Sequence, residues 1–254
     1  MSGLGVRANS KKDQSGSLAA DKQRPAPEMR SRPRSSGRRL FQCEDAAMVN
    51  ALAPTISALM RTLGKERDLT LRSGQFSKTR GLPHGANWLG LYSCETEPVY
   101  RYAFALWWGE QQGKTAAWVL LNPATGDTDG KSRPILTACR HRSSSWGCTS
   151  LVVVNLFAYR NRDPKQLAEG SAVGEHNNRA LEVITGASGL TVAAWGAGGG
   201  KWQRSMSVRP WLDNPQCLPK NGTVTTLNGE PFYPKGIRLD TELVPLPEPP
   251  VPVR

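Results

Sequence analysis

The chain has 254 residues and a mass of 27.7 kDa, a size that fits one large domain or two small ones. Hydrophobic residues make up 38 %, against about 45–50 % in an ordinary globular protein, which indicates that part of the chain packs no core. It contains no run of about 18 apolar residues and no apolar signal segment, so the sequence predicts neither a membrane span nor secretion.

The net charge of +12 is concentrated near the N-terminus. Residues 1–80 hold 16 Lys+Arg and 7 Asp+Glu (+9), whereas residues 81–254 hold 17 and 14 (+3). We expect residues 1–44 to be a disordered basic leader, acting either as a solvated tail or as an arm that contacts nucleic-acid phosphates. The nearly balanced remainder does not favour a nucleic-acid interface built from charge alone.

Five scattered cysteines form neither a CxxC pair nor a Cys/His zinc spacing; they are Cys43, Cys94, Cys139, Cys148 and Cys217. An odd, scattered set is typical of reduced thiols, so we expect a cytoplasmic protein. The cysteines predict no metal site, the sequence predicts no cofactor, and it does not specify an oligomeric state.

In chain order, the second predicted segment, 45–84, consists of a helix at 45–63 and a linker. The sequence predicts a loop at 67–86. From residue 85 onwards, strands at 100–108, 116–121, 151–154 and 190–194 alternate with helices at 132–146 and 174–184. This alternation predicts an α/β domain over 85–245, a three-layer α/β/α sandwich with a mostly parallel central sheet. A proline-rich tail occupies 246–254.

Polar or small residues follow three apolar strands, where sheets of this kind bind ligands. Asn122, Asn155 and Trp195 stand at these strand ends. Either asparagine could simply form a turn. Together they predict a pocket in which amides bind a nucleobase edge and an aromatic ring stacks on the base. The further ligand-binding candidates in these three segments are Pro123, Thr125, Phe157, Tyr159, Arg160 and Gly196.

The loop at 126–133 mixes acids and bases ahead of a predicted helix N-terminus, where anions bind favourably. Lys131 and Arg133 are candidates for a phosphate, and Asp127 and Asp129 for ordering a water or a metal. The alternative is a solvated loop whose charges neutralise each other. The spacing is not that of a Walker phosphate loop, and no serine or cysteine triad is visible.

Asn177 lies on the apolar stripe of the predicted helix 174–184, where an unpaired amide costs about 1–3 kcal/mol. We therefore expect it to bond either a backbone group of the Asn155 loop or a ligand.

Several segments in combination resemble the bacterial and phage domain-of-unknown-function family sixteen-forty-three, over roughly residues 88–237. They are Tyr100-Arg-Tyr102, 121–127, 129–134, Trp146-Gly147, 154–160, Asp163-Pro164, Gly174 with Asn177-Asn178, and Ala194-Trp-Gly196. The resemblance implies no particular activity.

A more distant resemblance is to the uracil-DNA glycosylase fold, which has an Asn-Pro after its first core strand, as at Asn122-Pro123. Its last motif is a His-Pro, and Tyr233-Pro234 stands at that place here. In glycosylases this histidine stabilises charge on the departing base, which a neutral tyrosine does only by donating a hydrogen bond. The resemblance makes Asn122 and Tyr233 candidate catalytic residues, and Asp127 of the loop at 126–133 is the third candidate.

These patterns favour an enzyme that processes nucleic acid or nucleotides, by N-glycosidic cleavage or another base modification. Two alternatives remain: a catalytically inactive module that binds nucleotide or nucleic acid, and a small-molecule enzyme that uses the same cleft. Nucleic acid or nucleotide is the expected partner, and a membrane is not.

Deleting residues 1–40 removes 10 Lys+Arg and 3 Asp+Glu, a charge change of −7. We predict an unchanged melting temperature, because this segment has almost no apolar surface to bury. Any affinity for DNA should fall and lose much of its salt dependence. A truncated protein that melts several degrees earlier would contradict the assignment of a leader.

Overall fold

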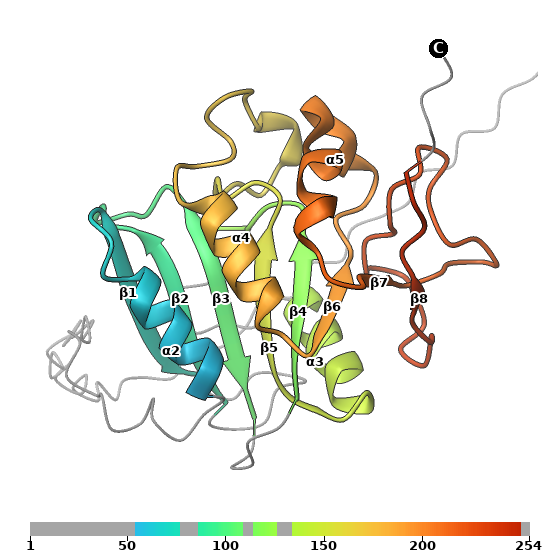
Figure 1. Ribbon diagram of the computed structural model, residues 1–254, viewed down its shortest axis with the longest axis horizontal. Coiled ribbons are helices and arrows are strands. Elements are labelled where there is room, and N and C mark those ends of the chain that lie inside the picture. Colours follow the sequence, from blue (N-terminus) through green and yellow to red (C-terminus); the bar gives the residue numbers. More distant parts are fainter. Residues whose placement is uncertain (1–53, 77–85, 109–113, 126–133, 250–254) are drawn as a thin grey trace, which may run out of the picture. The chain divides into compact units, whose positions relative to one another are not determined.

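The computed structural model describes residues 54–76, 86–108, 114–125 and 134–249. Their strands form one eight-stranded sheet in the order β1-β2-β3-β5-β4-β6-β7-β8 (Figure 1). The strands are β1 (Leu69–Gln75), β2 (Asn87–Ser93), β3 (Arg101–Trp107), β4 (Lys114–Leu120), β5 (Cys148–Asn155), β6 (Leu190–Ala193), β7 (Gln216–Cys217) and β8 (Val244–Pro245).

Four α-helices and three short 3-10 helices accompany the sheet in the described residues. The α-helices are α2 (Pro54–Leu63), α3 (Pro134–Ser145), α4 (Asn177–Gly186) and α5 (Arg204–Val208). The 3-10 helices are η1 (Pro164–Gln166), η2 (Ala197–Gln203) and η3 (Arg209–Trp211). The four expected strands and the helices expected at 132–146 and 174–184 are all present, with ends shifted by a few residues.

The expectation of a mostly parallel sheet is wrong. Four of the seven strand pairings are antiparallel, and the three parallel ones join β5, β4, β6 and β7. Two of the antiparallel pairings come from the segment before residue 101, where the loop expected at 67–86 contains β1 and β2 follows it. The other two are β3 with β5 and β7 with β8. Short connections between consecutive strands favour antiparallel pairs, and β1 is a half-buried edge strand whose polar residues hide its pattern.

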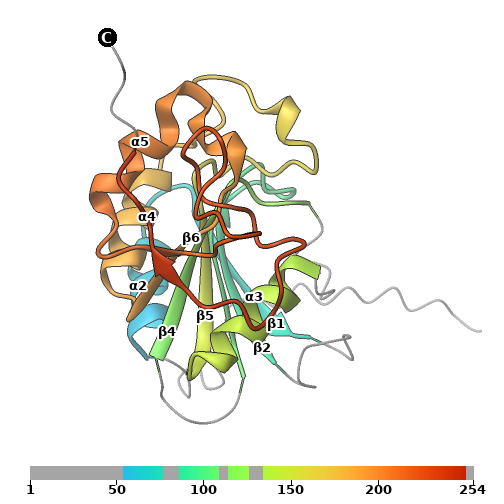
Figure 2. The ribbon, with the colours of Figure 1, turned by 90° about the vertical axis from the view of Figure 1, so that its right-hand side faces the viewer.

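Two hydrophobic clusters flank the sheet because successive residues of a strand point to opposite faces. Val152 and Val154 of β5 belong to the cluster that includes residues of α2 and α4. Leu151 and Val153 belong to the cluster that includes residues of α3. Figure 2 shows α2 and α4 on one side of the strands and α3 on the other. We call these the α4 face and the α3 face.

A buried arginine on α3 holds the segment that follows Tyr233. Arg142 is 1 % exposed, and its Nη2 donates hydrogen bonds to the carbonyl oxygens of Ile237 (2.7 Å) and Arg238 (3.1 Å). Burial lowers the pKa of Arg142. The C-terminal loop is thereby fixed against the α3 face, which places Tyr233 near the ends of the central strands.

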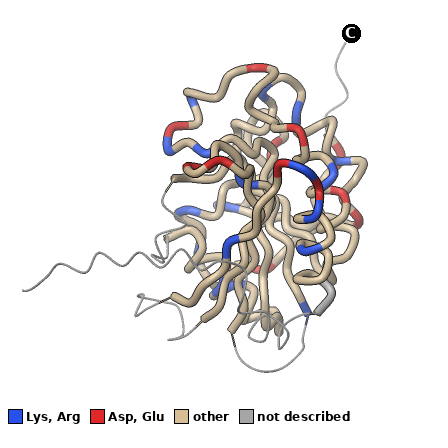
Figure 3. Tube along the Cα trace, turned by 90° about the vertical axis from the view of Figure 1, so that its left-hand side faces the viewer, with Lys and Arg blue, Asp and Glu red and all other residues tan. Residues whose placement is uncertain are grey.

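Charged side chains are mixed in sign along the described chain, and Figure 3 shows lysines and arginines interspersed with acidic residues over the loops. This agrees with the small charge surplus of residues 81–254. No described helix combines the length and apolar character that crossing a bilayer requires. The proposed leader at 1–44 lies outside the described residues.

Candidate functional site at the carboxyl edge of the sheet

The segments that follow β4 and β5 lie side by side and are joined by hydrogen bonds. The amide N–H of Phe157 donates to the carbonyl of Leu121 (2.9 Å), and that of Asn161 donates to the carbonyl of Pro123 (2.9 Å). Asn122 adds a side-chain bond, from its Nδ2 to the carbonyl of Asn161 (2.8 Å). The Asn122 NH₂ group therefore holds the two loops together.

Asn155, the last residue of β5, is 1 % exposed. Its Oδ1 accepts a hydrogen bond from Nη2 of Arg101 (3.2 Å), whereas its Nδ2 finds no hydrogen-bond partner among the described residues. Arginine only donates hydrogen bonds, so this contact fixes which end of the amide is oxygen. A buried donor of this kind costs about 1–3 kcal/mol while it stays unpaired.

Arg101 reaches Asn155 because β3 runs antiparallel to β5, which brings the start of β3 to the exit of β5. Its backbone N–H donates to the carbonyl of Ala158 (2.9 Å), and its guanidinium carbon lies 5.3 Å from the centre of the Phe104 ring. With 5 % exposure, Arg101 places a positive charge in the wall of the site.

Tyr233 approaches this group from the C-terminal loop. Gly196, after β6, has φ of +75°, and a Cβ there would lie 3.2 Å from Cβ of Tyr233. Both the backbone angle and the close approach favour glycine. Burial raises the pKa of Tyr233 to about 12, and the charge of Arg101 opposes that rise. Tyr233 is therefore a neutral hydroxyl donor near pH 7.

Trp195 lies on the opposite face from this group. Its side chain is 1 % exposed in the cluster of the α4 face, and its Nε1 donates to Oε2 of Glu230 at 2.6 Å. The ring has no free face on which a base could stack. Successive residues of an extended chain point to opposite faces of the sheet. This alternation explains why Trp195 points away from the group around Asn155.

An exposed aromatic that the sequence analysis missed lies further along, in η2. Trp202 is 40 % exposed, its ring lies edge-on to Phe157 at 5.5 Å, and Lys201 Nζ is 5.7 Å from its centre. Trp202 and Gln203 both have left-handed backbones, with φ of +49° and +56°. Strained backbone of this kind is common where side chains are presented to ligands. The sequence signal was the Lys-Trp pair directly after a glycine run.

Asn177, at the start of α4, bonds the backbone of the Asn155 loop. This is the first of the two partners that the sequence predicted for it. Its Nδ2 donates to the carbonyl oxygens of Asn155 (3.0 Å) and Leu156 (2.9 Å). It thus supports the exit of β5 from the α4 face.

The remaining candidates after β4 and β5 also make structural contacts. The Arg160 guanidinium donates to the carbonyl of Pro98, and the hydroxyl of Thr125 accepts from Nε of Arg162 (3.2 Å). Tyr159 packs edge-on against Tyr100, with ring centres 6.0 Å apart. Asp127, Asp129, Lys131 and Arg133 lie outside the described residues.

Neither described histidine belongs to this site. His141 is exposed on α3, and Nδ1 of His176 lies 3.0 Å from Oε2 of Glu66. Within the ranges that the structure describes, no group of three or more His, Cys, Asp or Glu residues is arranged to hold a metal ion.

A family model described as "Protein of unknown function (DUF1643)" matches residues 101–234. The chain belongs to this family. The matched segment starts at Arg101, ends one residue after Tyr233 and includes the whole group around Asn155. Neither a curated protein nor a solved structure matches the chain, so the resemblance to the glycosylase fold stays a prediction.

The strained backbone at Gln203 makes a prediction about stability. Gln203→Gly should raise the free energy of unfolding by about 0.5–1 kcal/mol, because glycine adopts a positive φ without steric cost. The exposed Gln166 in η1, which has no positive φ, is the matched control. Gln166→Gly should lower it by a similar amount, and chemical denaturation measures both. Equal destabilisation by the two changes would rule out strain at Gln203.

Proposed function

We propose that the carboxyl edge of the sheet binds a nucleobase, free in a nucleotide or within a nucleic acid, and that the protein is an enzyme that processes it. The observation that carries this proposal is the buried Nδ2 of Asn155, which has no partner in the described structure and whose orientation Arg101 fixes. A hydrogen-bond acceptor on a ligand would satisfy this donor.

Nucleobases suit this group because their edges present carbonyl oxygens and ring nitrogens that accept hydrogen bonds. The Asn155 amide supplies one donor, and the neutral hydroxyl of Tyr233 is a second. The buried charge of Arg101 favours a ligand atom that carries or develops negative charge. The reaction that fits is one in which a base departs or is modified at this edge.

Trp202 and Lys201 extend the proposal beyond the base. An exposed indole offers a stacking face to a neighbouring base, worth about 1–3 kcal/mol. The Lys201 ammonium donates to the carbonyl of Pro164 (2.8 Å) beside that ring and brings positive charge near a phosphate. These residues favour a ligand larger than a free base.

Tyr233 also favours a second candidate function, a binding module without catalysis. The resemblance to glycosylases implies a histidine at this place, and a tyrosine with a pKa raised to about 12 supplies no cation near neutral pH. Such a module would recognise the same base through Asn155 and release it unchanged.

Isothermal titration of the full chain with free bases, nucleotides and single-stranded DNA tests the proposal. Asn155→Asp is the sharpest variant, because aspartate has nearly the same shape and still pairs with Arg101, while the NH₂ donor becomes an acceptor. Affinity should fall about tenfold or more, which corresponds to about 1–3 kcal/mol. Asn87→Ala, at the start of β2 and the opposite end of the sheet, is the control and should bind as the wild type does.

Unchanged affinity in a folded Asn155→Asp protein would contradict the assignment of the site. Product analysis on modified and unmodified single-stranded DNA separates the two functions: turnover supports the enzyme, and binding without product supports the module. Binding of nucleotides alone would indicate a small-molecule enzyme.

A further inference from the structure

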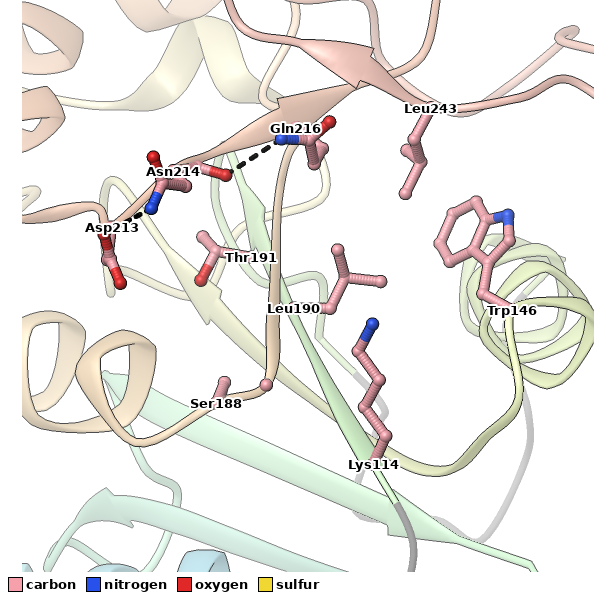
Figure 4. A pocket seen from close by; sticks show the side chains of 10 residues that line it. Lys114, Trp146, Ser188, Leu190, Thr191, Asp213, Asn214, Gln216 and Leu243 are labelled. Atoms are coloured by element: carbon pink, nitrogen blue, oxygen red, sulfur yellow. Dashed lines mark hydrogen bonds between the residues drawn. The ribbon is translucent and has the colours of Figure 1, made fainter.

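A pocket of about 490 Å³ lies at the other end of the sheet, at the start of β4 and β6 (Figure 4). Its walls come from the first residue of β4, the turn into β6, the end of α3 and the segments around β7 and β8. The volume falls within the range of about 300–1,000 Å³ that small-molecule sites occupy. Of the predicted site residues that the structure describes, none lines it.

Among the described residues that line this pocket, Lys114 carries the one cationic side chain. Figure 4 shows its ammonium group reaching into the space in front of Leu190. It makes no hydrogen bond or ion pair with any part of the chain that the structure describes. Gly189 shapes its course, because a Cβ at Gly189 would lie 3.1 Å from Cγ of Lys114. The pocket therefore offers an anionic group a positive charge that is not paired with any acidic side chain the structure describes.

The wall beside Lys114 is apolar and aromatic. Trp146 stacks on the fully buried Trp118, with ring centres 5.6 Å apart and an interplanar angle of 21°. The Trp118 Nε1 is itself held by Oγ of Ser143 (2.9 Å). Leu190 and Leu243 are also half-buried and pack against the same core as Trp146. This rigid wall suits a flat ring.

The far wall carries hydrogen-bond acceptors. Asn214 donates from Nδ2 to Oδ1 of Asp213 (2.9 Å), and Gln216 donates from Nε2 to the carbonyl of Asn214 (3.0 Å). These contacts leave Oδ2 of Asp213 and Oε1 of Gln216 to accept from a ligand. The negative charge of Asp213 turns an anionic group away from this wall and toward Lys114.

We propose that this pocket binds a small planar aromatic anion that carries an N–H or O–H donor at the end opposite its charge. The anionic group pairs with Lys114, the ring lies along Trp146, and the donor bonds Asp213 or Gln216. Either a carboxylate or a phosphate supplies the negative charge that pairs with the Lys114 ammonium group. The inference concerns a second site and does not depend on the function proposed for the carboxyl edge.

Titration with para-aminobenzoate and with adenosine monophosphate, each against its neutral analogue para-aminobenzamide or adenosine, tests the proposal. The Asn155→Asp background weakens nucleotide binding at the carboxyl edge, and para-aminobenzoate, which is no nucleotide, tests the pocket independently of that edge. Lys114→Met should weaken binding of an anion about tenfold or more, whereas Lys65→Met, at an exposed lysine outside the pocket, should not. Trp146→Leu should weaken it as well.

Binding of only one anion that depends on Lys114 identifies carboxylate or phosphate as the recognised group. The proposal is overturned if neither anion binds more tightly than its neutral analogue. It is equally overturned if the Lys114→Met and Lys65→Met proteins bind the anions alike.

Discussion

The hydrogen bond from Arg101 to Asn155 links the two halves of this sheet. It joins the first residue of β3, in the antiparallel half, to the last residue of β5, where the parallel half begins. Both side chains are almost fully buried, so each would be costly without the other. The pairing sets the orientation of the Asn155 amide and leaves its NH₂ group for a ligand.

Other contacts at this edge serve the same arrangement. Asn177 fixes the backbone of Asn155 from the α4 face, and Asn122 ties the loops after β4 and β5 together. Gly196 allows Tyr233 to come close. The three asparagines thus have different tasks: Asn122 and Asn177 stabilise loops, and Asn155 keeps an unpaired donor. Burial and partners distinguish them, and residue type does not.

The sequence predicted much of this edge but not which side chains form the site there. Apolar runs located β4, β5 and β6. The helical stripe predicted that Asn177 would bond either the Asn155 loop or a ligand, and the structure shows the first of these. The sequence marked Arg101 only as part of the Tyr100-Arg-Tyr102 segment of the family resemblance, because its role depends on an antiparallel pairing that hydrophobic pattern does not encode. The burial of Trp195 was missed because a strand end alone does not say which face a ring takes. Trp202 and the Lys114 pocket depend on loop geometry, which sequence pattern leaves undefined.

The central claim is that the Asn155 NH₂ group contacts the ligand directly. The side-chain amide resonances of Asn155 in isotope-labelled protein, assigned by their loss in Asn155→Asp, report on this group. We predict that a saturating nucleotide or oligonucleotide shifts them and slows their hydrogen exchange, while the amide resonances of Asn87 stay in place. Unchanged Asn155 resonances at a concentration where titration shows full binding would contradict the account.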